Sequence, residues 1–118
     1  MTAFNIQHGL LHAENVALRD IARTHQTPTY VYSKSALTQA FASFQAGLLG
    51  HDHLICFVVK ANPSLAILNL FARMGAGFDI VSGGELARVI AAGGDPNKVV
   101  FSGVGKSHAE FQSALDPG

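Results

Sequence analysis

Apolar and polar positions follow two rhythms along the chain, and together they predict strands that alternate with helices. Residues 54–59 form an unbroken apolar run, which is typical of a strand buried on both faces of a parallel sheet. Large apolar side chains then recur every three residues between 65 and 74, as on one face of a helix. The same order begins again with the short strands predicted at 78–81 and 99–101. The pattern therefore predicts three consecutive βα units.

The first third of the chain has a weaker pattern. Residues 1–12 show little periodicity, so we expect an irregular or extended lead-in there. Apolar residues at helical spacing predict an amphipathic helix over residues 14–25. The proline that follows ends this helix, and the β-branched and aromatic residues at 29–32 predict a short strand. A second helix is expected next, with Ser33 or Ser35 as its cap.

Strand ends near residues 60, 81 and 101 suggest how the units are arranged. A spacing of about twenty residues suits either a βα barrel or a doubly wound parallel sheet, both of them α/β folds. A closed eight-stranded barrel needs about 250 residues, so a chain of 118 residues holds less than half of one. We therefore expect a lead-in segment over residues 1–32 and the first βα units of an incomplete barrel over residues 33–118.

Composition narrows the class of protein. Hydrophobic residues make up 48% of the chain and charged residues only 14%, which predicts a packed core rather than disorder. Eight basic residues balance eight acidic ones, so we expect no binding to nucleic acid or to a membrane surface. The single cysteine, Cys56, lies in the apolar run and predicts a buried thiol in a reducing compartment. With no secretory leader and no membrane-length apolar run, the sequence predicts a cytoplasmic protein.

Lys60 is the first candidate for chemistry, because it stands at the carboxyl end of the first buried strand. Ligands of parallel α/β folds bind at these strand ends. A lysine with an apolar environment can lose its proton near neutral pH and attack a carbonyl carbon. Lys60 is therefore a candidate Schiff-base lysine. The alternative is that its side chain only extends to solvent where the strand leaves the core.

The two following strand ends carry further polar groups. Asp79 and Glu85 flank a serine-glycine-glycine turn, and a second glycine-containing turn spans residues 102–106. An amine, two carboxylates and turns with free N–H groups suit a phosphorylated aldehyde cofactor. Asp79 could instead be a buried polar residue bonded to backbone, or it could hold the Lys60 amine. Glu85 could simply interact favourably with the dipole of the helix that begins there.

The third turn also resembles the end of a nucleotide-binding phosphate loop. Lys106 is preceded by a glycine and followed by a serine, but the first glycine of that motif would stand at Val100. Ser107 is already explained as a helix cap that forms a capping box with Glu110. The histidines show no recurring ligand spacing, so we expect surface residues and no metal site. These are His8, His12, His25, His51, His53 and His108.

Several motifs occur in a fixed order over most of the chain. They are Thr27–Tyr32, Val59–Asn62 with Leu65–Leu68, Gly75–Leu86 and Val100–Lys106. From about residue 16 to the end, this combination resembles the amino-terminal part of the diaminopimelate decarboxylases. The resemblance implies an alanine-racemase-like (β/α) barrel of the TIM type, of which this chain holds the first part.

The resemblance also implies a cofactor and a reaction. It implies pyridoxal 5′-phosphate held by Lys60 through a Schiff base, and Asp79 and Glu85 match acidic positions near the cofactor in this family. The implied activity is the decarboxylation of meso-diaminopimelate to L-lysine in lysine biosynthesis, by a homodimer that acts on a small amino acid. The family's glycine-rich phosphate site, its stacked histidine and its carboxyl-terminal β-domain are absent from the 118 residues. We therefore expect this chain alone to be inactive.

Other functions remain open at this point. A decarboxylase of another basic amino acid, of the ornithine or arginine type, would share the fold and the cofactor. A racemase would share Lys60–Asn62, but Pro63–Leu65 does not continue in the manner of racemases. A non-catalytic cofactor carrier would bind the aldehyde without releasing carbon dioxide. A nucleotide-binding protein would depend on Lys106 instead of Lys60.

Overall fold

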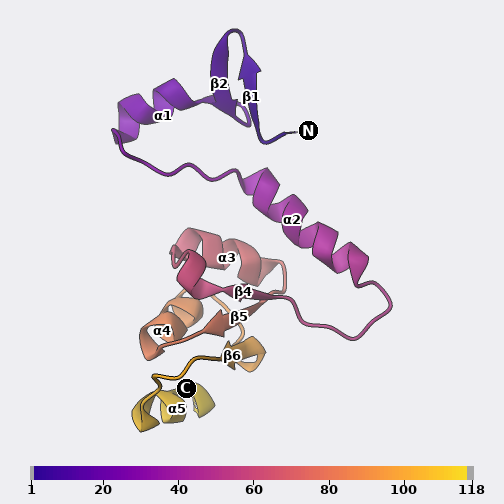
Figure 1. Ribbon diagram of the computed structural model, residues 1–118, viewed down its shortest axis with the longest axis vertical. Helices are drawn as coiled ribbons and strands as arrows, with labels where there is room; N and C mark the ends of the chain where they lie inside the picture. The colour runs from indigo at the N-terminus through magenta and orange to yellow at the C-terminus, as the bar shows by residue number, and fades with distance from the viewer. Residues whose placement is uncertain (1, 117–118) are drawn as a thin grey trace. The chain divides into compact units, whose positions relative to one another are not determined.

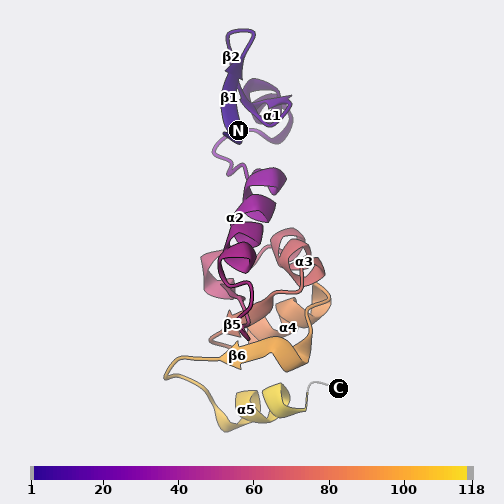
Figure 2. The ribbon, with the colours of Figure 1, turned by 90° about the vertical axis from the view of Figure 1, so that its right-hand side faces the viewer.

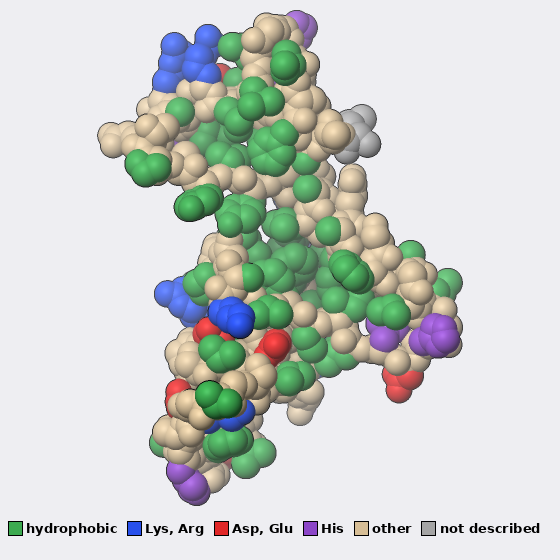
Figure 3. All heavy atoms as spheres, viewed as in Figure 1, with side chains coloured by type: hydrophobic (Ala, Val, Ile, Leu, Met, Phe, Trp, Pro, Cys, Tyr) green, Lys and Arg blue, Asp and Glu red, His purple; other side chains and the backbone are tan. Residues whose placement is uncertain are grey.

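The structure is a computed structural model that describes residues 2–116, and the chain divides into two units between Leu49 and Gly50. Each unit contains its own three-stranded sheet, antiparallel in the first and parallel in the second (Figure 1). Exposed hydrophobic side chains occur in both units (Figure 3). The units are described separately below.

A β-hairpin opens the first unit. Its elements are β1 (Phe4–Gln7), β2 (Leu10–Ala13), β3 (Val16–Ala17), α1 (Leu18–His25) and α2 (Lys34–Gly47). β1 and β2 are joined by His8 and Gly9, whose φ angles of 51° and 78° are both positive. Two-residue turns of this kind match the twist of antiparallel strands. The sheet is completed by β3, which pairs with β2.

Three expectations for this unit need correction. The hairpin lies within residues 1–12, where the sequence predicts only an irregular or extended lead-in. The first helix begins at Leu18 rather than at residue 14, because the chain turns at Glu14, where φ is 54°, and then forms β3. The strand predicted at 29–32 is wrong. No described strand pairs with this segment, and Tyr30 is 92% exposed.

The start of α2 is fixed by hydrogen bonds that it donates to a distant carboxylate. Oε1 of Glu14 accepts one bond from the Ser33 hydroxyl at 2.7 Å and another from the Ser35 backbone N–H at 2.8 Å. The hydroxyl of Ser33 accepts a bond from the N–H of Ala36, so Ser33 is the helix cap that the sequence predicts. The Ser35 N–H is the main reason why the pKa of Glu14 lies below its usual value.

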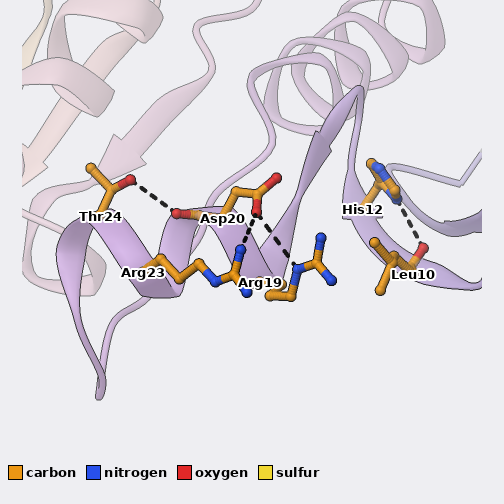
Figure 4. Close-up of polar contacts among 6 residues, drawn as sticks. All are labelled: Leu10, His12, Arg19, Asp20, Arg23 and Thr24. Atoms are coloured by element: carbon orange, nitrogen blue, oxygen red, sulfur yellow. Dashed lines mark hydrogen bonds and ion pairs between the residues drawn. The ribbon is translucent and has the colours of Figure 1, made fainter.

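Polar contacts around α1 lie on the surface (Figure 4). Asp20 forms ion pairs with Arg19 and Arg23 at 3.7 and 3.8 Å, and its backbone carbonyl accepts a bond from the Thr24 hydroxyl. Nδ1 of His12 donates to a backbone carbonyl on the same strand. Exposed ion pairs of this kind contribute little to stability.

The second unit contains the three βα units that the sequence predicts. Its elements are β4 (Cys56–Val58), η1 (Val59–Ala61), α3 (Leu65–Arg73), β5 (Gly77–Ile80), α4 (Gly83–Ala91), η2 (Pro96–Lys98), β6 (Val99–Phe101) and α5 (His108–Leu115). The strands are parallel and lie in the order of the chain, with β5 in the centre (Figure 1). Figure 2 shows β5 and β6 as neighbours in this sheet. Consecutive βα units with neighbouring parallel strands are the building blocks of both barrels and open sheets.

One face of this sheet packs against α3 and α4. Phe78 and Ile80 of β5 are completely buried there, as are Leu68 of α3 and Val89 of α4. The neighbouring strand joins the same core through Phe57, whose ring stacks on Phe71 of α3 with centroids 4.6 Å apart. The largest fully buried side chains among the described residues, Val59 included, belong to the second unit. Its core therefore lies between the sheet and these two helices.

Close packing also explains why Gly77 is a glycine. A Cβ atom there would lie 2.6 Å from the backbone oxygen of Lys98 and 2.8 Å from Sγ of Cys56. Both distances are shorter than a van der Waals contact, so a side chain would push β5 away from its neighbours.

No helix among the described residues is long and apolar enough to cross a membrane.

Candidate functional site

The carboxyl ends of β4, β5 and β6 lie at one edge of the parallel sheet, which is where the candidate residues gather. Lys60 lies in η1, directly after β4. The strand ends slightly earlier than the sequence predicts, because the backbone enters a 3₁₀ turn at Val59. Lys60 is exposed and makes no hydrogen bond or ion pair with the described residues. Its amine is therefore accessible to a reagent at this edge.

Asp79 lies on the sheet face opposite to α3 and α4. It pairs with Val58 on one side and Val100 on the other, and paired residues of parallel strands share a face. The hydroxyl of Ser102 donates to Oδ1 of Asp79 at 2.5 Å. Asp79 is half-buried, and no hydrogen bond joins it to Lys60. Neither sequence alternative is found, because Asp79 is bonded to the side chain of Ser102, just after β6, and not to backbone or to the Lys60 amine.

Cys56 is the third polar group on this face. Burial raises the pKa of its thiol, and the negative charge of Asp79 raises the pKa further. The thiol is therefore protonated at neutral pH, and its reactivity as a nucleophile is low. The side chain is half-buried and has no disulfide partner in this chain.

Glu85 holds the turn between β5 and α4. Its Oε2 atom accepts a hydrogen bond from the backbone N–H of Val81 at 2.8 Å. Its own N–H donates to the hydroxyl of Ser82, which caps α4. These bonds agree with the sequence alternative in which Glu85 serves the start of a helix. They also fix the backbone at the end of β5, two residues beyond Asp79.

The amine of Lys106 is occupied by its own neighbours. Nζ donates to the backbone carbonyl of Phe101 at 3.1 Å and lies 5.4 and 5.3 Å from the ring centroids of Phe101 and Phe111. Cation–π contacts at these distances favour a lysine packed against rings over one that holds a phosphate. The arrangement therefore argues against the nucleotide-binding alternative.

The predicted capping box at α5 is confirmed and extends further than expected. Ser107 and Glu110 exchange the two reciprocal hydrogen bonds of that motif. The second carboxylate oxygen of Glu110 accepts a bond from the N–H of Gly83, at the start of α4. The hydrogen bond from Gly83 has the largest effect on the pKa of Glu110, and the bonds from Ser107 add to it. Together they hold this pKa below its usual value of 4.5. One carboxylate thus connects the first turns of two helices.

Sequence reasoning does not identify Ser102 as a partner of Asp79. The sequence places Ser102 at the third strand end, but only the strand register shows which residue it faces.

Among residues 2–116, no three metal-binding side chains gather at one point. Nδ1 of His53, one of the histidines considered as ligands, donates to a backbone carbonyl.

Comparisons with known proteins place this geometry in a family. Residues 34–118 match the family model described as "Pyridoxal-dependent decarboxylase, pyridoxal binding domain". The chain is 55% identical over all of its 118 residues to the diaminopimelate decarboxylase of Pseudomonas fluorescens, of which it spans 28%. It thus spans less than a third of the length of this relative.

Solved structures agree with this match. A crystal structure of an Aquifex aeolicus protein superimposes with a TM-score of 0.91 and 39% identity, over 97% of this chain and 28% of that one. The diaminopimelate decarboxylase of Helicobacter pylori, crystallised with L-lysine, gives a TM-score of 0.78 and 43% identity, over 83% of this chain and 25% of that one.

These findings confirm two predictions from the sequence. The fold is the first part of an alanine-racemase-like (β/α) barrel, and the family depends on a pyridoxal cofactor. The described residues fit such a cofactor, because an accessible amine and a carboxylate with one oxygen unbonded belong to the same end of the sheet. The chain therefore belongs to the pyridoxal binding domain family of the pyridoxal-dependent decarboxylases.

Proposed function

We propose that the protein carrying this chain decarboxylates meso-diaminopimelate to L-lysine, with pyridoxal 5′-phosphate attached to Lys60. The observation that carries the proposal is the 55% identity with a diaminopimelate decarboxylase over the whole chain. At that identity the fold and the local arrangement of side chains are normally retained. The accessible amine after β4 adds independent support, because it stands where parallel α/β proteins bind ligands.

Each candidate residue has a distinct task in this proposal. Bound pyridoxal phosphate supplies an electron sink that allows the α-carboxylate to leave as carbon dioxide. Lys60 would hold the cofactor, and its amine would move a proton at the substrate when it is free. Asp79 presents its unbonded oxygen, Oδ2, to a cationic group. Glu85 supports the cofactor site indirectly. Its carboxylate accepts a hydrogen bond from the turn after β5 and so holds that turn in place.

The attachment of the cofactor can be tested chemically. The full-length protein is loaded with pyridoxal phosphate, reduced with borohydride and digested, and the modified peptide is sequenced. We expect the pyridoxyl group on Lys60 and its loss in the Lys60→Arg variant. Lys106→Ala is the control, because that amine packs against two rings, and it should still be labelled at Lys60. Labelling of another lysine would refute the assignment.

The reaction needs a separate test. Release of carbon dioxide from meso-diaminopimelate, ornithine and arginine is compared at equal concentrations, in wild type and Lys60→Ala. We expect diaminopimelate to be preferred and the Lys60→Ala rate to fall by at least about a thousandfold. A preference for ornithine or arginine would favour the related decarboxylases. Labelling at Lys60 without carbon dioxide release would favour a cofactor carrier.

The same proposal covers the assembly and the place of action. We propose a cytoplasmic homodimer, in which residues outside this chain complete the site. An unpaired thiol at Cys56 is in keeping with a reducing compartment. Light scattering on the full-length protein would measure the mass. The isolated 118-residue chain should release no carbon dioxide, since it spans 28% of its relative.

A further inference from the structure

A short hydrogen bond joins Ser102 to Asp79 on the sheet face opposite to the helices. It joins side chains from β5 and from the residue after β6, 23 positions apart in the chain. The donor is a hydroxyl and the acceptor a carboxylate, separated by only 2.5 Å. Hydrogen bonds to a charged group are shorter and stronger than neutral ones. The contact therefore restricts the rotation of the Asp79 carboxylate.

The backbone holds Ser102 in place for this task. Its N–H donates to the carbonyl of Ile80 at 2.9 Å, which extends the pairing of β5 and β6 by one step. The next residue, Gly103, has a φ of 92° and turns the chain away from the sheet. The paired backbone fixes the position of Cα of Ser102 and the direction of its Cα–Cβ bond. The sheet thus holds the backbone of Ser102, and the hydroxyl of Ser102 in turn holds the carboxylate of Asp79.

The bond leaves one oxygen of Asp79 without a partner. Ser102 bonds to Oδ1, and the described residues offer no hydrogen bond to Oδ2. Asp79 is half-buried, so its charge is only partly screened by water. Its influence reaches Cys56, whose pKa it helps to raise. An oriented oxygen with this charge can hold a cation at the site, and the Lys60 ammonium is one such cation.

We propose that Ser102 is a positioning residue, whose hydroxyl orients the Asp79 carboxylate toward the cofactor-bearing amine. This inference rests on the proposed function, because it assumes a cofactor at Lys60. Ser102 acts through Asp79 and does not itself touch the reacting atoms. The orientation matters because a carboxylate that points away from the Lys60 nitrogen would no longer stabilise a positive charge on that nitrogen.

A pair of variants of equal size isolates the hydroxyl. Ser102→Thr keeps the donor, and Ser102→Val replaces it with a methyl group of similar volume. Both are made in the full-length protein, with Ser113→Val on the exposed side of α5 as the control. Four quantities are measured: the dissociation constant of pyridoxal phosphate, the absorbance spectrum of the bound cofactor, kcat and KM separately, and the melting temperature of the cofactor-free protein.

We expect Ser102→Val to bind pyridoxal phosphate about tenfold to a hundredfold more weakly, since a hydrogen bond to a charged group is lost. Its bound cofactor should absorb at a shifted wavelength, and kcat should fall more than KM rises. Ser102→Thr should restore all three quantities to within about threefold of wild type. Ser113→Val should match wild type.

Two outcomes would overturn the inference. If Ser102→Val lowers the melting temperature but leaves cofactor affinity, spectrum and kcat unchanged, Ser102 only satisfies a half-buried carboxylate. If Ser102→Thr fails to rescue while its melting temperature is normal, the hydroxyl is not the important group. Failure of the proposed function looks different: wild type itself would then take up no pyridoxal phosphate at Lys60.

Discussion

The two faces of the β4–β5–β6 sheet are built from the same strands but serve different purposes. On the face packed against α3 and α4, the residues of β5 are Phe78 and Ile80, and both are completely buried. On the other face, β5 presents Asp79, half-buried and bonded to Ser102. Successive side chains of a strand point to opposite faces, so one short strand supplies both.

Within three successive residues, Phe78 and Ile80 contribute to the stability of the fold, whereas Asp79 is a candidate for the chemistry of the site. A buried apolar side chain contributes free energy of folding, whereas a half-buried carboxylate contributes little and is available to a ligand. Substitutions on the two faces should therefore affect different measurements.

The largest effect is expected on the helix-packed face. Ile80→Ala should lower the free energy of unfolding by about 2–5 kcal/mol, because it opens a cavity at a fully buried position. Ile90→Ala is the matched control, since Ile90 is 38% exposed on α4, and its cost should stay below about 1 kcal/mol. Urea denaturation of the full-length protein measures both. Equal losses would show that the helix-packed face is not the main source of stability.

On the opposite face, a change of charge should alter reactivity more than stability. Asp79→Asn keeps the shape of the side chain but removes the negative charge that helps to raise the pKa of Cys56. We expect the pKa of the thiol to fall and its alkylation by iodoacetamide at pH 7.5 to become faster, with the melting temperature little changed. Mass spectrometry of the Cys56 peptide follows the rate in cofactor-free protein. An unchanged or slower rate would mean that the Asp79 charge does not reach the thiol.

The smallest effect concerns the carboxylate that links α4 and α5. Because hydrogen bonds hold the pKa of Glu110 below its usual value of 4.5, its ionised form stabilises the fold. That stabilisation is complete above the unfolded-state pKa and is lost as pH falls through the lower folded-state pKa. Glu110→Gln should therefore flatten the loss of stability below about pH 4.5. Asp52→Asn, an exposed loop carboxylate, is the control and should leave the slope unchanged.

Much of the second unit follows from the sequence, because its signals are local. The unbroken apolar run predicts β4, and glycines mark the ends of the helices that follow each strand. Ser107 and Glu110 predict their own capping box from a spacing of three residues. Predictions from such short-range patterns are confirmed because the groups that interact are close in the chain.

The features that the sequence does not predict depend on distant partners. β1 alternates apolar and polar residues over only four positions, and the turn at His8 and Gly9 carries no asparagine or aspartate. The predicted strand at 29–32 has suitable residues but no neighbour to pair with in the described chain. The contact of Ser102 with Asp79 depends on the register of two strands, which local patterns leave open.

The order of the parallel strands has a consequence for synthesis. β5 and β6 each pair with the strand made just before them, so a ribosome releases each of them after its partner. Cys56 pairs with Gly77 and Phe78 with Val99, so each pairing closes one βα unit and no longer loop. The sheet can thus grow by one βα unit at a time while translation continues, and its growing edge is always the newest strand.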